Sequence, residues 1–287
     1  MVLPSVPPDA RAATILTSWT LNPLAIVPIV AAAWLYGLGL RRAARAGTPH
    51  PHRSAVAFFA GLAVVALALA SPIDAYAEAA FSVHMTQHLL LTLLAPPLLA
   101  LGAPITLALR ATRPATAKLL SRLLRSDLAV VLSNPVVGWV LFVGVAFAIH
   151  LTSLFDLALR SARVHALEHA LWLGAALVYW WPIVGRDPSA HPVSYPVRLL
   201  SLFLAMPAMS FLALAIYSAT GPLYEEYASL PAPWGPSALA DQRAGATMMW
   251  LVGNLSLVVG MLVVAAAWKR EEDARQRRLE ARAPGER

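Results

Sequence analysis

Apolar stretches of about twenty residues recur along this chain of 287 residues, and they limit its fold more than any other feature. A helix needs roughly 20 apolar residues to cross a hydrocarbon core of roughly 30 Å. Since lipid offers no hydrogen-bond partner to an open backbone, helices are the way to use such stretches. Apolar residues make up 59% of the chain, charged residues 13%, and the mean hydropathy is +0.63. We therefore expect an all-α, polytopic membrane helical bundle.

Seven transmembrane spans are expected in one domain over residues 21–268. A segment over 1–20 precedes this domain, and a charged tail over 269–287 follows it. The expected spans are about Leu21–Leu40, Ser54–Ala70, Val83–Leu109, Pro135–Leu151, Val164–Val184, Leu199–Ser218 and Gly245–Trp268. The tail, which begins after Trp268, is expected to be a frayed, solvated helical end.

Prolines mark two helix starts and one irregularity. Asn–Pro pairs at 22–23 and 134–135 predict helix starts, because the asparagine can cap the helix and proline lacks the N–H that would go unpaired there. Pro96 and Pro97 lie inside the third span, where they predict a kink or a neighbour that satisfies the freed carbonyl groups.

The basic residues predict the orientation of the bundle. Eighteen of the 22 Lys and Arg residues fall on one side if the N-terminus is outside; the other four are Arg11, Arg160, Arg163 and Arg243. Cytoplasmic loops carry an excess of Lys and Arg. This pattern predicts an extracytoplasmic N-terminus and a cytoplasmic C-terminus. The net charge of +7 reports this orientation, and we assign no nucleic-acid partner.

The chain has no cysteine, which excludes disulfides, thiolate nucleophiles and iron–sulfur ligation. Soft-metal chemistry must therefore use Met or His. The N-terminus has no basic region of the kind that opens a signal peptide, and the first apolar run ends at Arg41 and Arg42. We expect this run to be retained as a helix.

Five of the eight histidines are expected at the outer end of the bundle. Alternate spans run in opposite directions, so the start of the third, the end of the fourth and the start of the fifth meet at one side. The five are His84, His88, His150, His165 and His169. The others, expected to be ordinary solvated residues in inner loops, are His50, His52 and His191.

The spacing of these histidines predicts a metal site near the extracytoplasmic face. His84 with His88, and His165 with His169, are i, i+4 pairs that share one face of a helix. Imidazole is the commonest protein metal ligand, and bundle sites are built from inward-facing side chains. Thioethers with imidazoles and no thiolate suit copper, particularly Cu(I). Candidates for additional ligands or for supporting polar groups are Met85, Gln87, Glu168, Asp241, Gln242, Met248 and Met249, whereas Met206 and Met209 are expected in the core.

Other interpretations use the same residues. His165–His169 fits the HxxEH pattern of inverted zinc peptidases, a short pattern that occurs often by chance. A haem-binding redox protein with bis-His ligation, a di-iron membrane oxygenase, and a transporter or scaffold without metal stay open as alternatives. The Pro-rich loop over 219–242, which contains Tyr224 and Tyr227, is expected to cap the outer surface.

Three runs together resemble the CtaG family of multi-spanning membrane proteins. They are SVHMTQHLLLTLLAPPLLALGAP from Ser82, HALEHALW from His165 with WWPIVG after it, and ADQRAGATMMWLVGN from Ala240. The resemblance implies a role in assembling bacterial cytochrome c oxidase through copper delivery, by a carrier rather than an enzyme. It implies oxidase subunits as partners and suggests a periplasmic copper donor as a further partner. A homo-oligomer stays open. Residue by residue, it implicates His84, Met85, Gln87, His88, His165, His169, Asp241, Gln242, Met248 and Met249, while His150 rests mainly on the topology.

Overall fold

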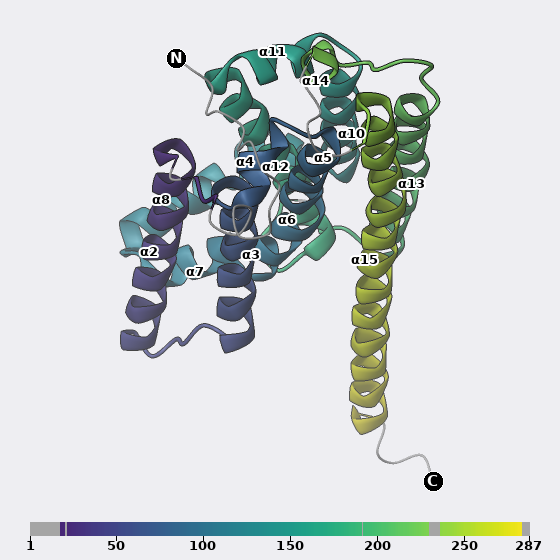
Figure 1. The fold of residues 1–287 in the computed structure, drawn as a ribbon. Coiled ribbons are helices and arrows are strands. Elements are labelled where there is room, and N and C mark those ends of the chain that lie inside the picture. The colour runs from purple at the N-terminus through teal and green to yellow at the C-terminus, as the bar shows by residue number, and fades with distance from the viewer. Residues whose placement is uncertain (1–17, 21, 191, 230–235, 283–287) are drawn as a thin grey trace.

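A computed structural model describes residues 18–20, 22–190, 192–229 and 236–282. Most of the expected N-terminal segment 1–20 and the solvated residue expected at His191 lie outside these described residues. Every regular element in the described part of the chain is a helix (Figure 1), so the all-α prediction is confirmed. The elements are α2 (Pro23–Arg45), α3 (His52–Ala70), α4 (Pro72–Ala77), α5 (Phe81–Leu89), the π-helix η1 (Leu90–Leu94), α6 (Ala95–Leu101), α7 (Pro104–Ala111), α8 (Pro114–Leu123), α9 (Asp127–Leu132), α10 (Pro135–His150), α11 (Leu154–Arg160), α12 (Ala162–Val184), α13 (Tyr195–Tyr217), α14 (Glu225–Ser229) and α15 (Ala238–Arg282).

A helix lies at each of the seven expected spans, but not all seven are long and apolar enough to cross a membrane by themselves. Five qualify, namely Pro23–Arg45, His52–Ala70, Phe81–Ala111, Tyr195–Tyr217 and Ala238–Ala281. A sixth is obtained if α10 and α11, which meet at a bend of 69°, count as one span. α12 is outside this set, and its first half carries Arg163, Glu168 and two histidines. These helices fit a multi-pass membrane protein, and the count of seven stays a prediction.

Both asparagine caps are confirmed. The side chain of Asn22 accepts a hydrogen bond of 3.0 Å from Leu24 N, and that of Asn134 accepts one of 2.9 Å from Val136 N. A proline follows each cap in the first helical turn. These caps fix where α2 and α10 begin, because each satisfies one of the N–H groups that an α-helix leaves open at its start.

The irregularity expected at Pro96 and Pro97 is resolved by a neighbouring helix. The five-residue π-helix η1 precedes α6, and the missing N–H of Pro96 leaves the carbonyl of Thr92 without its usual helical donor. The indole Nε1 of Trp180 in α12 donates to this carbonyl at 2.9 Å. A second break follows at Ala103, whose φ of 48° is left-handed, before α7 begins.

His50 is not the solvated residue that the sequence predicts. Its Nε2 lies 2.9 Å from the carbonyl oxygen of Gly102, which also accepts a 2.7 Å hydrogen bond from the hydroxyl of Tyr36. The close approach depends on a glycine, since a Cβ at position 102 would lie 2.6 Å from Cβ of Phe58. His50 therefore fastens the end of α6 to the α2–α3 hairpin, away from the other histidines.

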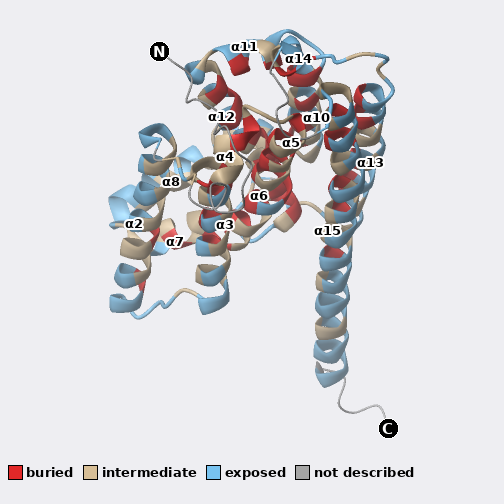
Figure 2. Ribbon diagram, in the orientation of Figure 1, coloured by how far each residue is buried: buried red, intermediate tan, exposed pale blue. Residues whose placement is uncertain are grey.

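Buried residues concentrate in one half of the bundle (Figure 2). Parts of α5, α6, α10 and α12 form this region, and α13 and α15 pack side by side along its edge (Figure 1). Large apolar side chains on α2, α13 and α15 are exposed, including Leu24, Trp34, Phe211 and Leu262. Such a surface is expected to face lipid.

The charged tail does not fray where the sequence predicts. α15 continues as one helix of 45 residues past Trp268 to Arg282, and its last turns extend beyond the rest of the bundle (Figure 1). The alternation of acidic and basic residues after Lys269, including Glu272 with Arg275 at 3.9 Å, supports a solvated helix.

The orientation can be measured because the chain has no cysteine of its own. Thr152 is exposed between α10 and α11, and Arg278 is exposed on the extension of α15. We expect a membrane-impermeant maleimide to label Thr152→Cys in intact spheroplasts and to label Arg278→Cys only after lysis, since the basic tail should be cytoplasmic. Labelling of Arg278→Cys in intact spheroplasts would contradict the predicted orientation.

Candidate metal centre

Five imidazoles from three helices meet at one end of the bundle. α5 supplies His84 and His88, α12 supplies His165 and His169, and the last residue of α10 is His150. All five are buried, with exposed fractions from 0% for His84 to 9% for His165. The helices that carry them surround the buried region near α11 and α14, opposite the extension of α15 (Figures 1 and 2).

The rings are close enough to form one cluster. The ring centroid of His84 lies 4.4 Å from that of His88, 5.2 Å from that of His165 and 6.2 Å from that of His169. His150 is at the edge, with its centroid 5.8 Å from that of His88. The i, i+4 spacing on α5 and α12 stacks each pair on one helix face, and the two faces point toward each other.

A tyrosine sets the tautomer of His84. The hydroxyl of Tyr227 in α14 donates to the carbonyl of Ala77 at 2.5 Å, so it must accept from Nδ1–H of His84, 3.0 Å away. Burial raises the pKa of Tyr227 well above its usual value, which keeps this hydroxyl protonated. With its proton on Nδ1, His84 presents the lone pair of Nε2 to the inside of the cluster.

His88 and Glu168 complete the centre of the cluster. Nε2 of His88 lies 3.0 Å from Nε2 of His84 and 3.3 Å from Oε1 of Glu168. The side chain of Glu168 is buried, with an exposed fraction of 4%. A carboxylate taken out of water is costly unless positive charge lies beside it.

Several buried polar atoms of the cluster have no hydrogen-bond partner among the described residues. They are Nδ1 of His88, Nε2 of His165, Nε2 of His169 and Oε2 of Glu168. Leaving a buried polar atom unpaired costs about 1–3 kcal/mol, so a concentration of such atoms favours a place where a ligand can bind. One ligand atom each from His84, His88 and His169 lies within 4.8 Å of the others, and the same holds for His84, His165 and Glu168. These donor sets fit a metal ion.

The other sequence-predicted residues are divided between the cluster and its supports. Nε2 of Gln87 donates to the carbonyl of Ala68 at 2.8 Å and to Oδ1 of Asp74 at 2.9 Å, so its amide nitrogen serves α3 and α4 rather than an imidazole. Burial raises the pKa of Asp74, and the hydrogen bonds from Thr20 and Gln87 oppose that rise. Gln87 thus holds α5 against its neighbours.

Asp241 and Gln242 also form hydrogen bonds with neighbouring segments, and among the described residues these bonds do not involve an imidazole. Asp241 accepts hydrogen bonds from the backbone N–H and the hydroxyl of Ser82. Gln242 accepts from Leu223 N at 2.7 Å and donates to the carbonyl of Ile216 at 3.0 Å. Together they tie α15 to the start of α5 and to the loop that carries α14.

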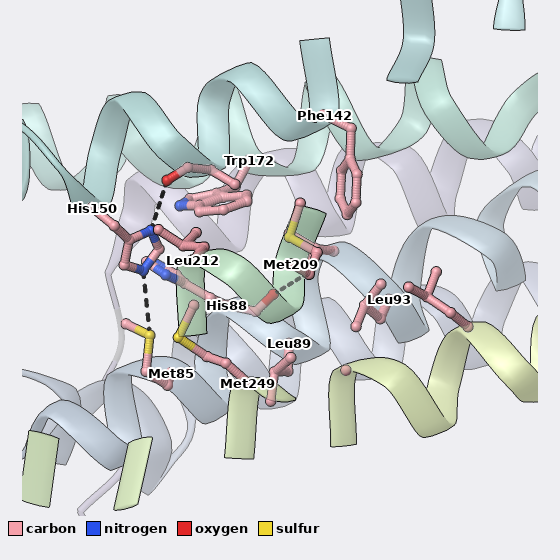
Figure 3. Close-up of a pocket in the computed structure, with 14 residues that line it drawn as sticks. Met85, His88, Leu89, Leu93, Phe142, His150, Trp172, Met209, Leu212 and Met249 are labelled. Atoms are coloured by element: carbon pink, nitrogen blue, oxygen red, sulfur yellow. Dashed lines mark hydrogen bonds between the residues drawn. The ribbon is translucent and has the colours of Figure 1, made fainter. Parts of the chain in front are cut away.

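The methionines that the sequence suggests as ligands differ in whether they line the cavity beside His150. Sδ of Met85 lies 3.4 Å from Nε2 of His150, and Met249 lines the same cavity (Figure 3), whereas Met248 does not line it. The close approach of α15 to α5 fixes the rotation of α15, because a Cβ at Gly245 would lie 2.5 Å from the ring of Phe81. Met249, four residues after Gly245, lies on the side of α15 that packs on α5 and lines the cavity with His88 and His150. Met209, expected in the core, also lines this cavity.

Tyr227 is the functional residue that sequence reasoning did not find. The loop 219–242 was expected only as an outer cap, of which residues 230–235 lie outside the described residues. Tyr224 and Tyr227 are both buried, and they pack on Phe81 of α5. Two tyrosines three residues apart in a Pro-rich loop are the signal that could have indicated insertion into the bundle.

The fold and the cluster define a helical membrane protein with a buried polyhistidine site at one end. The chain belongs to the cytochrome c oxidase caa3 assembly factor family, Caa3_CtaG, whose model matches residues 34–271. This confirms the resemblance found in the sequence. No solved structure matches the chain significantly.

Mycobacterial proteins are similar to this chain over most of its length. An uncharacterized protein of Mycobacterium leprae is 31% identical over 264 residues, which cover 89% of this chain and 40% of that protein. Uncharacterized proteins of Mycobacterium bovis and Mycobacterium tuberculosis are each 32% identical over 280 residues, which cover 94% of this chain and 42% of theirs. The chain thus spans about two fifths of the length of these relatives.

Replacing Tyr227 tests the support of His84. We expect Tyr227→Phe to lower the free energy of unfolding by about 1–3 kcal/mol, because Nδ1–H of His84 and the carbonyl of Ala77 both lose their partner. Thermal unfolding in detergent measures this loss, and ¹⁵N spectra of labelled histidine should show His84 leaving the Nδ1–H tautomer.

Tyr224→Phe is the matched control, because the hydroxyl of Tyr224 makes one 3.3 Å hydrogen bond to the carbonyl of His150 and touches no ring nitrogen. Equal melting temperatures for the two variants, with the His84 tautomer unchanged, would refute the role given to Tyr227.

Proposed function

We propose that this chain is a copper carrier of the bacterial inner membrane that delivers copper to a haem–copper cytochrome c oxidase during assembly. The observation that carries the proposal is the buried cluster, in which imidazoles from three helices and one carboxylate leave several nitrogen and oxygen atoms unpaired. Family membership supplies the assembly pathway. The acceptors are oxidase subunits, and a periplasmic copper protein is the donor.

The donor set favours copper over the other common metals. Imidazole nitrogens predominate, a thioether lies 3.4 Å from His150, and the chain has no thiolate. Cu(I) accepts thioether and imidazole ligands, whereas Mg²⁺ and Ca²⁺ need several oxygen ligands and structural Zn²⁺ sites use thiolates in most cases. We therefore propose that the transported ion is Cu(I).

A carrier needs ligands that can exchange. The cluster offers more nitrogen donors than one ion needs, and His84 belongs to both of the close donor sets. An ion could therefore move between overlapping sets by replacing one ligand at a time. In the proposed topology of seven spans with the N-terminus outside, the cluster lies near the extracytoplasmic face, where oxidase subunits could receive the ion.

The geometry gives less support to the alternatives. The cavity beside the cluster has a volume of about 40 Å³, which suits a water molecule or an ion and not a porphyrin. A di-iron membrane oxygenase usually needs more histidines than this cluster has and carries them on the cytoplasmic side, whereas the proposed topology places this cluster at the extracytoplasmic end. An inverted peptidase would need a groove for peptide beside His165, His169 and Glu168, all of which are buried.

Copper binding can be tested by removing one face of the cluster. We expect the double variant His84→Ala, His88→Ala to lose at least one copper ion per chain, because His84 belongs to both close donor sets and His88 belongs to one of them. The measurement is metal analysis of protein purified without oxygen after loading with Cu(I), together with an absorption spectrum that reports any haem.

His50→Ala is the matched control, since His50 is a partly buried histidine that bonds to Gly102 outside the cluster. In cells that lack this chain, the double variant should fail to restore oxidase activity and the control should restore it. Unchanged copper stoichiometry in the double variant, or a Soret band in the native protein, would refute the carrier.

A further inference from the structure

A second group of soft donors lies beside the histidine cluster. The cavity of about 40 Å³ is bordered by three methionines and two of the imidazoles (Figure 3). These five residues are Met85, Met209, Met249, His88 and His150. Most of the remaining lining is apolar and comes from leucines of α5, η1, α13 and α15, together with Phe142 and Trp172. The cavity thus excludes hard, strongly hydrated cations and presents sulfur.

Two lone pairs face each other in this cavity. Nδ1–H of His150 donates to the carbonyl of Ala146 at 2.9 Å, because a carbonyl oxygen can only accept. The neutral ring then has a bare lone pair on Nε2, which lies 3.4 Å from Sδ of Met85. The thioether is also an acceptor and has no hydrogen to donate. A soft cation bound by both atoms would supply the partner that neither has.

The spacing suits a shared ion. At the distances known for zinc, about 2.0 Å to imidazole nitrogen and about 2.3 Å to sulfur, two ligands at a tetrahedral angle are about 3.5 Å apart. The 3.4 Å between Nε2 of His150 and Sδ of Met85 is close to this separation. Met249 borders the cavity from α15 and can provide a third ligand. Both sulfur residues are placed by packing, since Met85 is fully buried and Gly245 fixes the rotation of α15.

We propose that Met85, His150 and Met249 form a second copper site, specific for Cu(I), at the edge of the cluster and separate from the two donor sets of α5 and α12. The inference rests on the proposed function as a copper carrier and names the next position of the ion within the chain. His88 joins the two sites, because its Nε2 lies in the cluster and its ring lines the cavity. Copper could pass from imidazole to thioether ligands without contact with lipid.

The test is X-ray absorption spectroscopy of the full chain loaded with Cu(I) under anaerobic conditions. We expect sulfur scattering at about 2.3 Å in the native protein. The double variant Met85→Leu, Met249→Leu should lose the sulfur signal and one copper ion per chain while it keeps copper bound by nitrogen. Methionine to leucine conserves volume and usually costs less than about 1.5 kcal/mol, so the variant should fold.

Met248→Leu is the matched control, because Met248 is the neighbour of Met249 and does not line the cavity. It should keep the sulfur signal, and so should the double variant His84→Ala, His88→Ala. Native protein that binds copper through nitrogen alone, or a sulfur signal that persists in Met85→Leu, Met249→Leu, would overturn the second site and leave the carrier intact. Native protein that binds no copper would overturn the carrier itself.

Discussion

The burial of five imidazoles and a carboxylate at one end of a membrane bundle is the constraint that organises this molecule. Each buried polar group needs a partner, and the hydrocarbon around the helices provides none. The protein itself supplies some of these partners, because His84 donates to the hydroxyl of Tyr227 and His150 donates to the carbonyl of Ala146. Atoms of His88, His165, His169 and Glu168 have no partner among the described residues, and the proposed metal ion would supply one.

The surrounding structure can be understood as support for these side chains. Trp180 satisfies the carbonyl that Pro96 frees, so α5 and η1 keep their place beside α12. Gln87 holds α5 to α3 and α4, and Asp241 holds it to α15. Since hydrogen bonds in a low-dielectric interior are strong and directional, these contacts help to hold the ligand atoms of His84, His88 and His169 within 4.8 Å of one another.

Much of this arrangement could be predicted from the sequence because it depends on periodic patterns. Hydropathy located a helix at each of the seven expected positions, and the i, i+4 spacing of His84 and His88 correctly placed both on one face. Because alternate spans run in opposite directions, the sequence also predicted that His150 lies at the same end as the other four histidines. Both results follow from chain direction and helix geometry, which a single sequence contains.

The unpredicted features depend on contacts between distant segments. Nothing local in the loop 219–242 specifies that Tyr227 reaches His84, 143 residues away in the chain. The apolar sequence of α15 does not specify which side faces α5, so the packing of this helix on its neighbours, including Gly245 on Phe81, places Met249 and not Met248 at the cavity. His50 was misplaced for the same reason, because its partner at Gly102 is 52 residues away.

The central claim is that imidazoles of α5 and α12 share a metal ion. Anomalous X-ray diffraction at the copper absorption edge would test this claim. The sample is the full chain, loaded anaerobically with Cu(I) and crystallised from detergent or from a lipidic phase. The account predicts a peak within bonding distance, about 2.0 Å, of nitrogen atoms on α5 and α12. An anomalous map with copper only at surface residues, or with no copper in a chain whose histidine rings are positioned as described, would contradict it.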